Sequence, residues 1–375
     1  MSVTKRYNRM CNGAIASTSQ PHGEELIPVD TNEPTSYIGR WDVSRTANDS
    51  VRAYLLGSAN NYELHFYGYG ATANYASLST APYYTAPWAS YTSGINSIVF
   101  HNGIADVGQL NFFGRVSTNP NPGNLKKVAV TFSSTVRVLQ RYAIYCTPLL
   151  SVDLGKGLRK MGEAALYASS DNQTIDFPLS LQIANYSAIQ GYTGSGATNY
   201  SYLKAHTPSG GFFIVGDGVL LWGKPTGTIW TIPEGIKSVC CFPWDNRVNV
   251  TAVTLPSTTK YIAFGAFATY SNLQKIKLPR GTERIYGLAF QNCTNLTKIW
   301  IPRSVKIVDT SSIVTNTGEY SYTSYPFTGC SNLTIYCEID SSEIPEGWSE
   351  YWNYIASGTQ ATVVWNTSEA VFDNL

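Results

Sequence analysis

Residues 272–285 read NLQKIKLPRGTERI, and residues 295–308 read NLTKIWIPRSVKIV, which is the same pattern 23 residues later. An apolar residue followed by proline recurs at this interval, at Ile232-Pro233, Leu255-Pro256, Leu278-Pro279 and Ile301-Pro302. Self-similarity at a period of about 20–50 residues indicates a solenoid, in which successive units stack on one another. The sequence therefore predicts a repeat solenoid.

Each unit is expected to form one short strand that ends at the proline. In the clearest copy, Leu296, Ile299 and Ile301 end in the period of two that is typical of a strand with one buried face. Pro302 then ends the strand, because proline has no N–H to continue the ladder. A second apolar position, Val308 in this copy, turns the chain back. No unit can bury its apolar side alone, so neighbouring units must stack.

Looser copies of the pattern extend the array upstream, and they predict one elongated solenoid with short parallel strands and irregular or short-helical returns. A hairpin is expected over Phe212–Trp222, inside an insertion. The predicted organisation is an extended N-terminal arm or tether over residues 1–38, a β-rich lead-in over 39–94, the solenoid over 95–345 with insertions near 184–222 and 309–326, and a C-terminal cap over 346–375.

These repeats resemble the BspA-type leucine-rich repeat family, which occurs on bacterial and protist surfaces and in phage-encoded proteins. The resemblance rests on the run Leu255–Val308, the phrase FTGCSNLTIYC at Phe327–Cys337 and the ending around Ile344–Trp348. Upstream, Gly39–Val43 is similar to the segment that precedes such repeats. The insertion Asp309–Tyr325 departs from the family pattern. The resemblance implies a recognition or adhesion scaffold with no catalysis of its own.

Composition argues against several classes of partner. Charged residues make up 14% of the chain, against about 25% in average soluble domains. The net charge of +1 provides no broad field that would attract nucleic acid or an anionic membrane. We therefore expect neither nucleic-acid binding nor membrane insertion, and a polar, weakly charged surface that suits exposure outside a cell.

Seven cysteines are present and none forms a C-x-x-C pair, so no zinc ligand set, redox motif or cofactor is indicated. Cys293 and Cys330 occupy the same place in successive units. They could form a bridge between stacked units, but we favour their interpretation as small buried side chains.

No secretion signal is readable, because Met10–Ser19 is too short and too polar for the apolar core of a signal peptide. We expect the protein to reach the outside by another route, such as a phage particle released by lysis. The first hypothesis is thus an exposed virion component with a decoration, fibre or receptor-binding role. The alternative is a bacterial or protist cell-surface adhesin.

The N-terminal 38 residues are polar and contain three prolines, which favours an extended segment. It is either a disordered tail or an arm that ties the solenoid to virion or cell-surface proteins. Its candidate contact residues are Ile15, Leu26, Ile27 and Val29. No trimer motif is present in the sequence, and homo-oligomerisation is left open.

Two surfaces are candidates for binding a host glycan or protein. In each strand of the solenoid sheet, the residue between the last two apolar positions points outward. These residues stack at the distance between neighbouring strands, about 4.8 Å. They are Asp153, Asp176, Thr231, Thr254, Lys277 and Trp300. The second candidate is a set of aromatic loops, because tyrosine gives a large contact area at small entropic cost; its members include Tyr83, Tyr84, Trp88, Tyr192 and Tyr322. The competing interpretations are a solvated face and rings that pack the loops onto the solenoid.

Catalysis is the least favoured class. The four histidines, His22, His65, His101 and His206, are expected in separate turns or loops, so no metal site or nucleophile–base pair is indicated. Asp153 and Asp176 would lie one turn apart, near the spacing of about 5–5.5 Å in retaining glycosidases. This coincidence among 25 acidic residues makes a carbohydrate-cleaving solenoid a weak third hypothesis.

Overall fold

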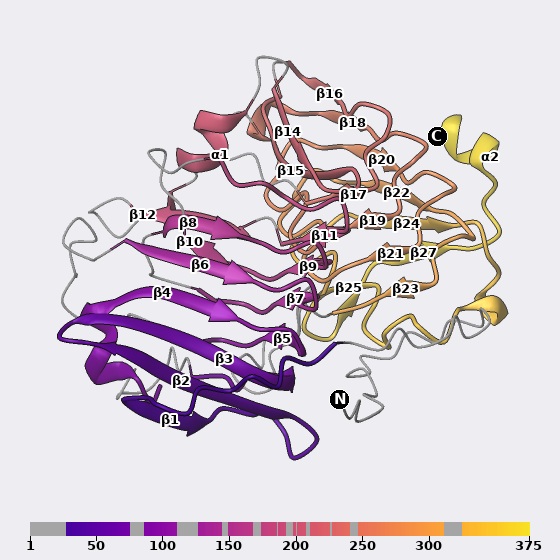
Figure 1. Cartoon of the computed structure of the whole chain (residues 1–375). Helices are drawn as coiled ribbons and strands as arrows, with labels where there is room; N and C mark the ends of the chain where they lie inside the picture. The colour runs from indigo at the N-terminus through magenta and orange to yellow at the C-terminus, as the bar shows by residue number, and fades with distance from the viewer. Residues whose placement is uncertain are drawn as a thin grey trace.

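Two stacks of short, mostly parallel strands form the protein (Figure 1). The structure is a computed structural model, and it describes residues 28–75, 86–110, 127–144, 149–167, 174–185, 187–192, 198–199, 201–207, 211–225, 227–240, 247–310 and 325–375.

The first stack is built on one ten-stranded sheet. Antiparallel strands β1 to β3 start it, and parallel strands follow in the order β4-β6-β8 on one side and β5-β7-β9-β11 on the other. Strand β3 is long enough to pair with both β4 and β5, which joins the two sides. The bounds are β1 Gly39–Asp42, β2 Ser50–Ser58, β3 Asn61–Ala71, β4 Ile95–Phe100, β5 Ile104–Val107, β6 Val128–Phe132, β7 Val138–Leu139, β8 Leu149–Asp153, β9 Lys160–Met161 and β11 Ile183–Ala184.

The second stack consists of two six-stranded sheets. Lys275 pairs with Lys298 and Tyr261 pairs with Arg284, so the 23-residue interval of the sequence is the register of the ladders. One sheet contains β14 Phe212–Val215, β15 Val219–Gly223, β17 Ser238–Val239, β19 Tyr261–Ile262, β21 Arg284–Ile285 and β23 Ile307–Val308. The other contains β16 Ile229–Thr231, β18 Ala252–Thr254, β20 Lys275–Lys277, β22 Lys298–Ile301, β24 Thr334–Cys337 and β27 Thr362–Val364.

Smaller elements complete the described part of the chain. The predicted hairpin is confirmed as the antiparallel pair β14–β15, and Gly216 and Gly218 in its turn have φ of 55° and 74°. The remaining elements are strands β10 Leu166–Tyr167, β12 Ile189–Tyr192, β13 Thr198–Asn199, β25 Tyr354–Ala356 and β26 Thr359–Gln360, helices α1 Ser201–His206 and α2 Glu369–Asp373, and 3-10 turns Ala89–Gly94, Arg247–Asn249 and Ser341–Glu343.

Stacked phenylalanines fill the core of the second stack. The rings of Phe267 and Phe290 lie 5.4 Å apart, and those of Phe290 and Phe327 lie 5.6 Å apart, both nearly parallel. All three side chains are fully buried. Phe66, Phe100 and Phe132 form an equivalent column in the first stack. In each stack, three units thus contribute one ring each to a continuous part of the core, as stacking of repeats predicts.

Polar and thiol side chains also recur from unit to unit. The amide of Asn272 donates to the carbonyl of Val248 at 2.5 Å, and that of Asn295 donates to Asn272 Oδ1 at 3.1 Å. Cys293 and Cys330 are buried free thiols, and each donates to a phenylalanine carbonyl at 3.1 Å. Their interpretation as small buried side chains is confirmed.

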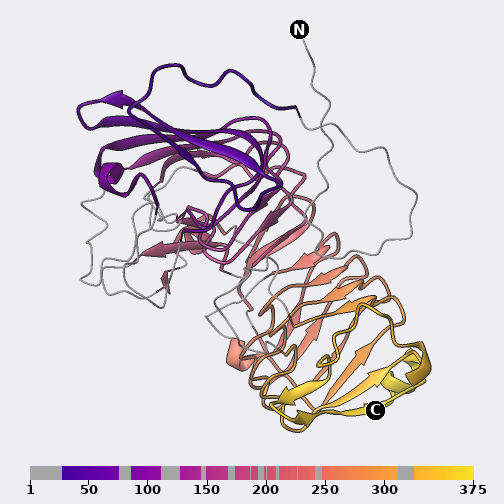
Figure 2. The same cartoon turned by 90° about the horizontal axis from the view of Figure 1, so that it is seen from below.

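The two stacks lie side by side instead of forming one uninterrupted column (Figures 1 and 2). Ser238 in β17 donates to the carbonyl of Gln182, next to β11. Burial, and then the nearby charge of Arg284 in β21, lowers the pKa of Lys160 in β9. Ala263 and Tyr286 of the second stack are also buried in the same core cluster as Met161 and Ile183 of the first stack. The chain changes direction between β11 and β16, within the part of the sequence where an insertion is predicted; the domain boundaries themselves stay a prediction.

Candidate ligand-binding surfaces

The outer face is the solvent-directed side of the sheet β16-β18-β20-β22-β24-β27, and the period of the repeats aligns its side chains. Thr231 pairs with Thr254, and both are exposed. Lys277 pairs with Trp300, which in turn pairs with Tyr336. The two rungs β16 and β18 therefore present hydroxyls to solvent, as expected, and the following rungs present a cation and aromatic rings.

Trp300 points to the outer face but is fully buried, which the sequence did not predict. The C-terminal segment crosses over it, and its indole Nε1 donates to the carbonyl of Thr367 at 2.8 Å. The guanidinium of Arg280 lies 5.4 Å from its ring centroid. A ligand can therefore reach Trp300 only if the C-terminal segment moves away.

Helix α2 is the element that covers this part of the outer face. Its Phe372 is fully buried, with its ring 5.5 Å from that of Tyr336 and the Nζ of Lys275 4.4 Å from its centroid. Ser368 caps the helix by accepting a hydrogen bond from the N–H of Val371. An aromatic side chain thus anchors a single short helix.

Ion pairs surround this anchor. Lys277 Nζ lies 2.9 Å from Asp373 Oδ1 and 3.0 Å from Glu369 Oε1, and Arg280 Nε donates to Glu369 Oε2 at 2.8 Å. The hydrogen bond with Asp373 is the main cause that raises the pKa of Lys277, and the hydrogen bond from Lys277 is the main cause that lowers the pKa of Glu369. Arg280 also donates to Glu338 at 2.6 Å. The cations of the outer face, Lys277 and Arg280, thus lie opposite the carboxylates of α2.

The two aspartates of the glycosidase hypothesis are not brought together on one ladder. Asp153 ends β8, the last strand of its path in the ten-stranded sheet, and its Oδ1 accepts a hydrogen bond from the N–H of Gly155 at 2.9 Å. Asp176 is exposed, and no strand of the described residues contains it. The paired rung that this hypothesis requires is therefore not formed.

The aromatic loops are only partly described. Trp88 is fully buried, and its ring lies 5.5 Å from those of Phe66 and Tyr75 and 6.3 Å from that of Trp41. It belongs to the core, so a direct ligand contact by Trp88 is excluded in this conformation. Tyr192 is the last residue of β12. Tyr83, Tyr84 and Tyr322 lie outside the described residues.

Residues 28–38, the last part of the predicted arm, pack onto the first stack. The N–H of Asp30 donates to the carbonyl of Asn102 at 2.8 Å, and Glu33 accepts hydrogen bonds from Arg52 at 3.0 Å and from Tyr54 at 2.5 Å. Val29 is 43% exposed. Ile15, Leu26 and Ile27 lie outside the described residues, so the tether stays a prediction.

The expectation that the histidines lie apart is wrong for His65 and His101. His65 Nδ1 lies 3.0 Å from His101 Nε2, and His101 Nδ1 lies 3.1 Å from Asp30 Oδ2. The ring of Tyr67 stacks on that of His101 at 3.8 Å. Burial, followed by the charge of His65, lowers the pKa of His101, which favours its neutral form. The pair ties the N-terminal segment to the sheet.

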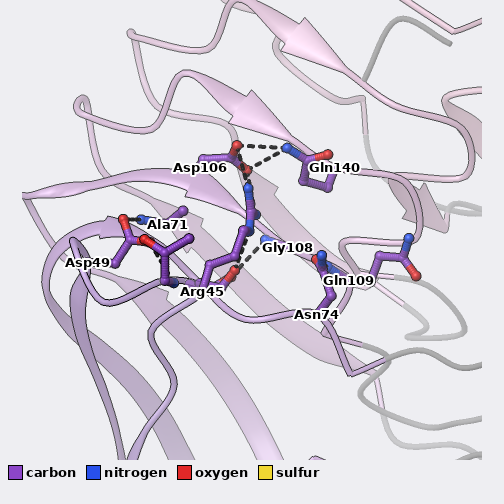
Figure 3. A network of polar contacts seen from close by, with 10 residues as sticks. Arg45, Asp49, Ala71, Asn74, Asp106, Gly108, Gln109 and Gln140 are labelled. Carbon is purple, nitrogen blue, oxygen red and sulfur yellow. Dashed lines mark hydrogen bonds and ion pairs between the residues drawn. The ribbon is translucent and has the colours of Figure 1, made fainter. Parts of the chain in front are cut away.

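A dense polar network joins the lead-in to the first repeats (Figure 3). Arg45 donates two parallel hydrogen bonds to Asp106 at 2.9 Å each, and Gln140 Nε2 lies 2.9 and 2.7 Å from the two Asp106 oxygens. Asp49 accepts a hydrogen bond from the N–H of Ala71 at 2.9 Å. The two carboxylates are thus held by donors from three strands or turns, although Gln140 Oε1 is buried without a hydrogen-bond partner, and the network serves the structure of the fold.

Metal sites and membrane spans are not indicated in the described part of the chain. Among the residues with described positions, no group of three or more His, Cys, Asp or Glu side chains could hold a metal ion. None of the described helices is long and apolar enough to span a membrane.

Three solved structures are similar to this chain. A leucine-rich repeat protein from Eubacterium ventriosum is 19% identical, with 80% of this chain and 78% of that chain covered and a TM-score of 0.33. A leucine-rich cell surface protein from Faecalibacterium prausnitzii is 16% identical, with coverage of 82% and 96% and a TM-score of 0.29. The pneumococcal vaccine antigen PcpA is 10% identical, with coverage of 89% and 100% and a TM-score of 0.27.

No curated protein matches the chain. The sequence pattern of the BspA type leucine-rich repeat region matches residues 89–195 and 228–336, in six copies, and these two ranges make up more than half of the chain. They correspond to the repeats of the first and second stacks. This protein is a member of the BspA-type leucine-rich repeat family.

Proposed function

We propose that this protein is a non-enzymatic recognition protein that acts as an adhesin on a bacterial cell surface. The leucine-rich repeat family to which it belongs is generally non-enzymatic and binds proteins. The family match supports the cell-surface alternative better than the virion setting that the sequence put first, for which the comparisons offer no support. The low proportion of charged residues, 14%, agrees with exposure outside a cell.

One observation carries the proposal, namely the in-register ladder of outward side chains on the outer face. Thr231 and Thr254 lie on adjacent rungs and are exposed, and Ile229 on the same strand is 65% exposed. Hydroxyls beside an apolar side chain on a rigid sheet suit a protein epitope or a glycan, because the sheet holds them without further loss of entropy. We assign recognition of a host-surface ligand to this face.

Placing arginines on the ladder tests this assignment. The double variant Thr231→Arg/Thr254→Arg is expected to bind at least about tenfold more weakly than the unchanged protein, because two bulky cations block the centre of the contact. The protein is applied to arrays of glycans and of host surface proteins, and the Kd for each captured ligand is compared between the variants.

Thr359→Arg is the matched control, since Thr359 is exposed in β26, outside the sheet that carries the ladder. It should leave both the Kd and the melting temperature unchanged. Equal affinity of the double variant and the unchanged protein would exclude the ladder as the recognition surface.

A further inference from the structure

Helix α2 covers the outer face without belonging to the core beneath it. The core of the second stack contains Ile299 and Ile335, and at its C-terminal end it is closed by Trp348 and Trp352. Phe372 is buried but is not part of this cluster, and it contacts the ring of Tyr336 and the Nζ of Lys275 on the outer face. Removal of α2 would therefore uncover the outer face and leave the core closed.

The helix and the surface below it are chemically complementary. Phe372 is flanked by the carboxylates of Glu369 and Asp373, and these pair with Lys277. Lys275 lies over the ring of Phe372 at 4.4 Å, a cation–π contact, and also donates to the Phe372 carbonyl at 2.8 Å. The outer face here is a shallow site for an aromatic ring between two carboxylates, and α2 occupies it in the way that a short amphipathic helix occupies a groove.

The attachment of α2 is weak enough to be reversible. The helix has five residues, which is too short for a stable helix without its contacts. The side chains of Lys277, Glu369 and Asp373 are 38%, 33% and 50% exposed, so water and salt screen their ion pairs. Asn366, which links β27 to α2, has a φ of 54° in the left-handed region that asparagine tolerates. The N–H groups of Asn366 and Thr367 donate to the carbonyls of Ile339 and Cys337 at 3.0 and 2.9 Å, so these bonds hold the linker while the helix beyond Thr367 can detach.

We propose that the outer face between β20 and β24 is a second recognition site, which takes an acidic segment of a partner protein with an aromatic anchor, and that α2 is its resident occupant. A partner segment that carries carboxylates around a Phe, Tyr or Trp displaces α2 and gains contact with Lys275, Lys277 and Tyr336. The helix thus lowers the apparent affinity for every ligand of the site by the same factor, so that only ligands that match the site well still bind. This inference rests on the proposal that the protein is a recognition protein, and adds the chemistry of one partner.

A peptide copy of the helix provides the probe. Fluorescein-labelled NTSEAVFDNL, the sequence of residues 366–375, is titrated with the 375-residue chain and its variants, and binding is followed by fluorescence anisotropy. Phe372→Ala removes the anchor and opens the site, so it should bind the peptide about tenfold more tightly than the unchanged chain, whose site is occupied. Adding Lys277→Glu to Phe372→Ala should abolish binding, and raising the salt concentration should weaken it.

Val371→Ala is the matched control, because Val371 is in the same helix but is 55% exposed. It should behave like the unchanged chain. Equal peptide affinity of the unchanged chain and Phe372→Ala, or no binding to Phe372→Ala when its circular dichroism is unchanged, would overturn the proposal. If these results overturn the second site while ligands still bind at the Thr231–Thr254 ladder, the proposed function stays in place.

Hydrogen exchange of the unchanged chain gives a test that requires no variant. Amides of residues 369–375 should exchange faster than those of β24, because α2 opens while the core stays closed. Equal protection of α2 and β24 would show that the helix does not open separately, and would also overturn the proposal.

Discussion

Replacing Phe290 with alanine is expected to lower the free energy of unfolding of the second stack by about 3–5 kcal/mol. Phe290 is fully buried and stacks between Phe267 and Phe327, at 5.4 and 5.6 Å. Its loss opens a cavity that spans three successive units. Because each unit is stabilised mainly by its neighbours, a gap in the middle weakens both interfaces.

Urea denaturation followed by circular dichroism measures this effect. Phe290→Leu, which keeps most of the buried volume, should cost clearly less, and Val248→Ala at a position that is 48% exposed should change the stability by about 0.5 kcal/mol or less. A loss below about 1 kcal/mol for Phe290→Ala would show that the ring column does not hold the units together.

Asp106→Asn is the second substitution for which we expect a large effect, a loss of about 2–3 kcal/mol in the free energy of unfolding. Breaking a buried ion pair leaves one charge uncompensated and costs about 3–5 kcal/mol. Arg45 and Asp106 are 19% and 16% exposed, so some solvent screening reduces this figure. The introduced amide can accept from Arg45 with only one oxygen, and its NH2 group faces the other N–H donor of Arg45 and the amide nitrogen of Gln140.

The exposed pair Lys237–Asp217 supplies the comparison. Its side chains are 41% and 52% exposed, so Asp217→Asn should cost about 0–1 kcal/mol. The double variant Arg45→Met/Asp106→Leu should recover part of the loss, because no unpaired charge remains. If thermal and urea unfolding give the same small loss for Asp106→Asn and Asp217→Asn, the network in Figure 3 does not stabilise the lead-in.

Periodicity made the architecture predictable from the sequence. The 23-residue interval is the register in which Lys275 meets Lys298, and the strand of the clearest copy ends at Ile301, immediately before Pro302. These are local properties, because alternation and proline act within one strand. Stacking then follows, since no unit can bury its apolar side alone.

The outer face could be predicted only in part. The direction of Trp300 follows from its place between Ile299 and Ile301, but its burial depends on Thr367, which is 67 residues further along the chain. No repeat contains the C-terminal segment, so periodicity carries no information about it. The side-by-side packing of the stacks could not be predicted for the same reason. It depends on a change of chain direction within an insertion, which is not part of the repeat pattern.

The meeting of His65 and His101 was missed although a signal exists. His65 precedes Phe66, and His101 follows Phe100; Phe66 and Phe100 pair in the ladder and stack at 4.5 Å. Aligning the lead-in strand with the first repeat by these phenylalanines would have placed both histidines on the outer side of neighbouring strands. Separation in sequence is therefore a poor guide to distance in a solenoid.

The most direct test of the central claim is to locate the protein in cells that express it. Quantitative mass spectrometry is applied to washed envelopes, cytosol and phage particles, with and without protease treatment of intact cells. A surface recognition protein should be recovered in the envelope fraction and be degraded by external protease while cytosolic markers survive. Recovery in the cytosol with full protection from protease would contradict the account, and stoichiometric recovery in phage particles alone would replace the cell-surface setting with the virion.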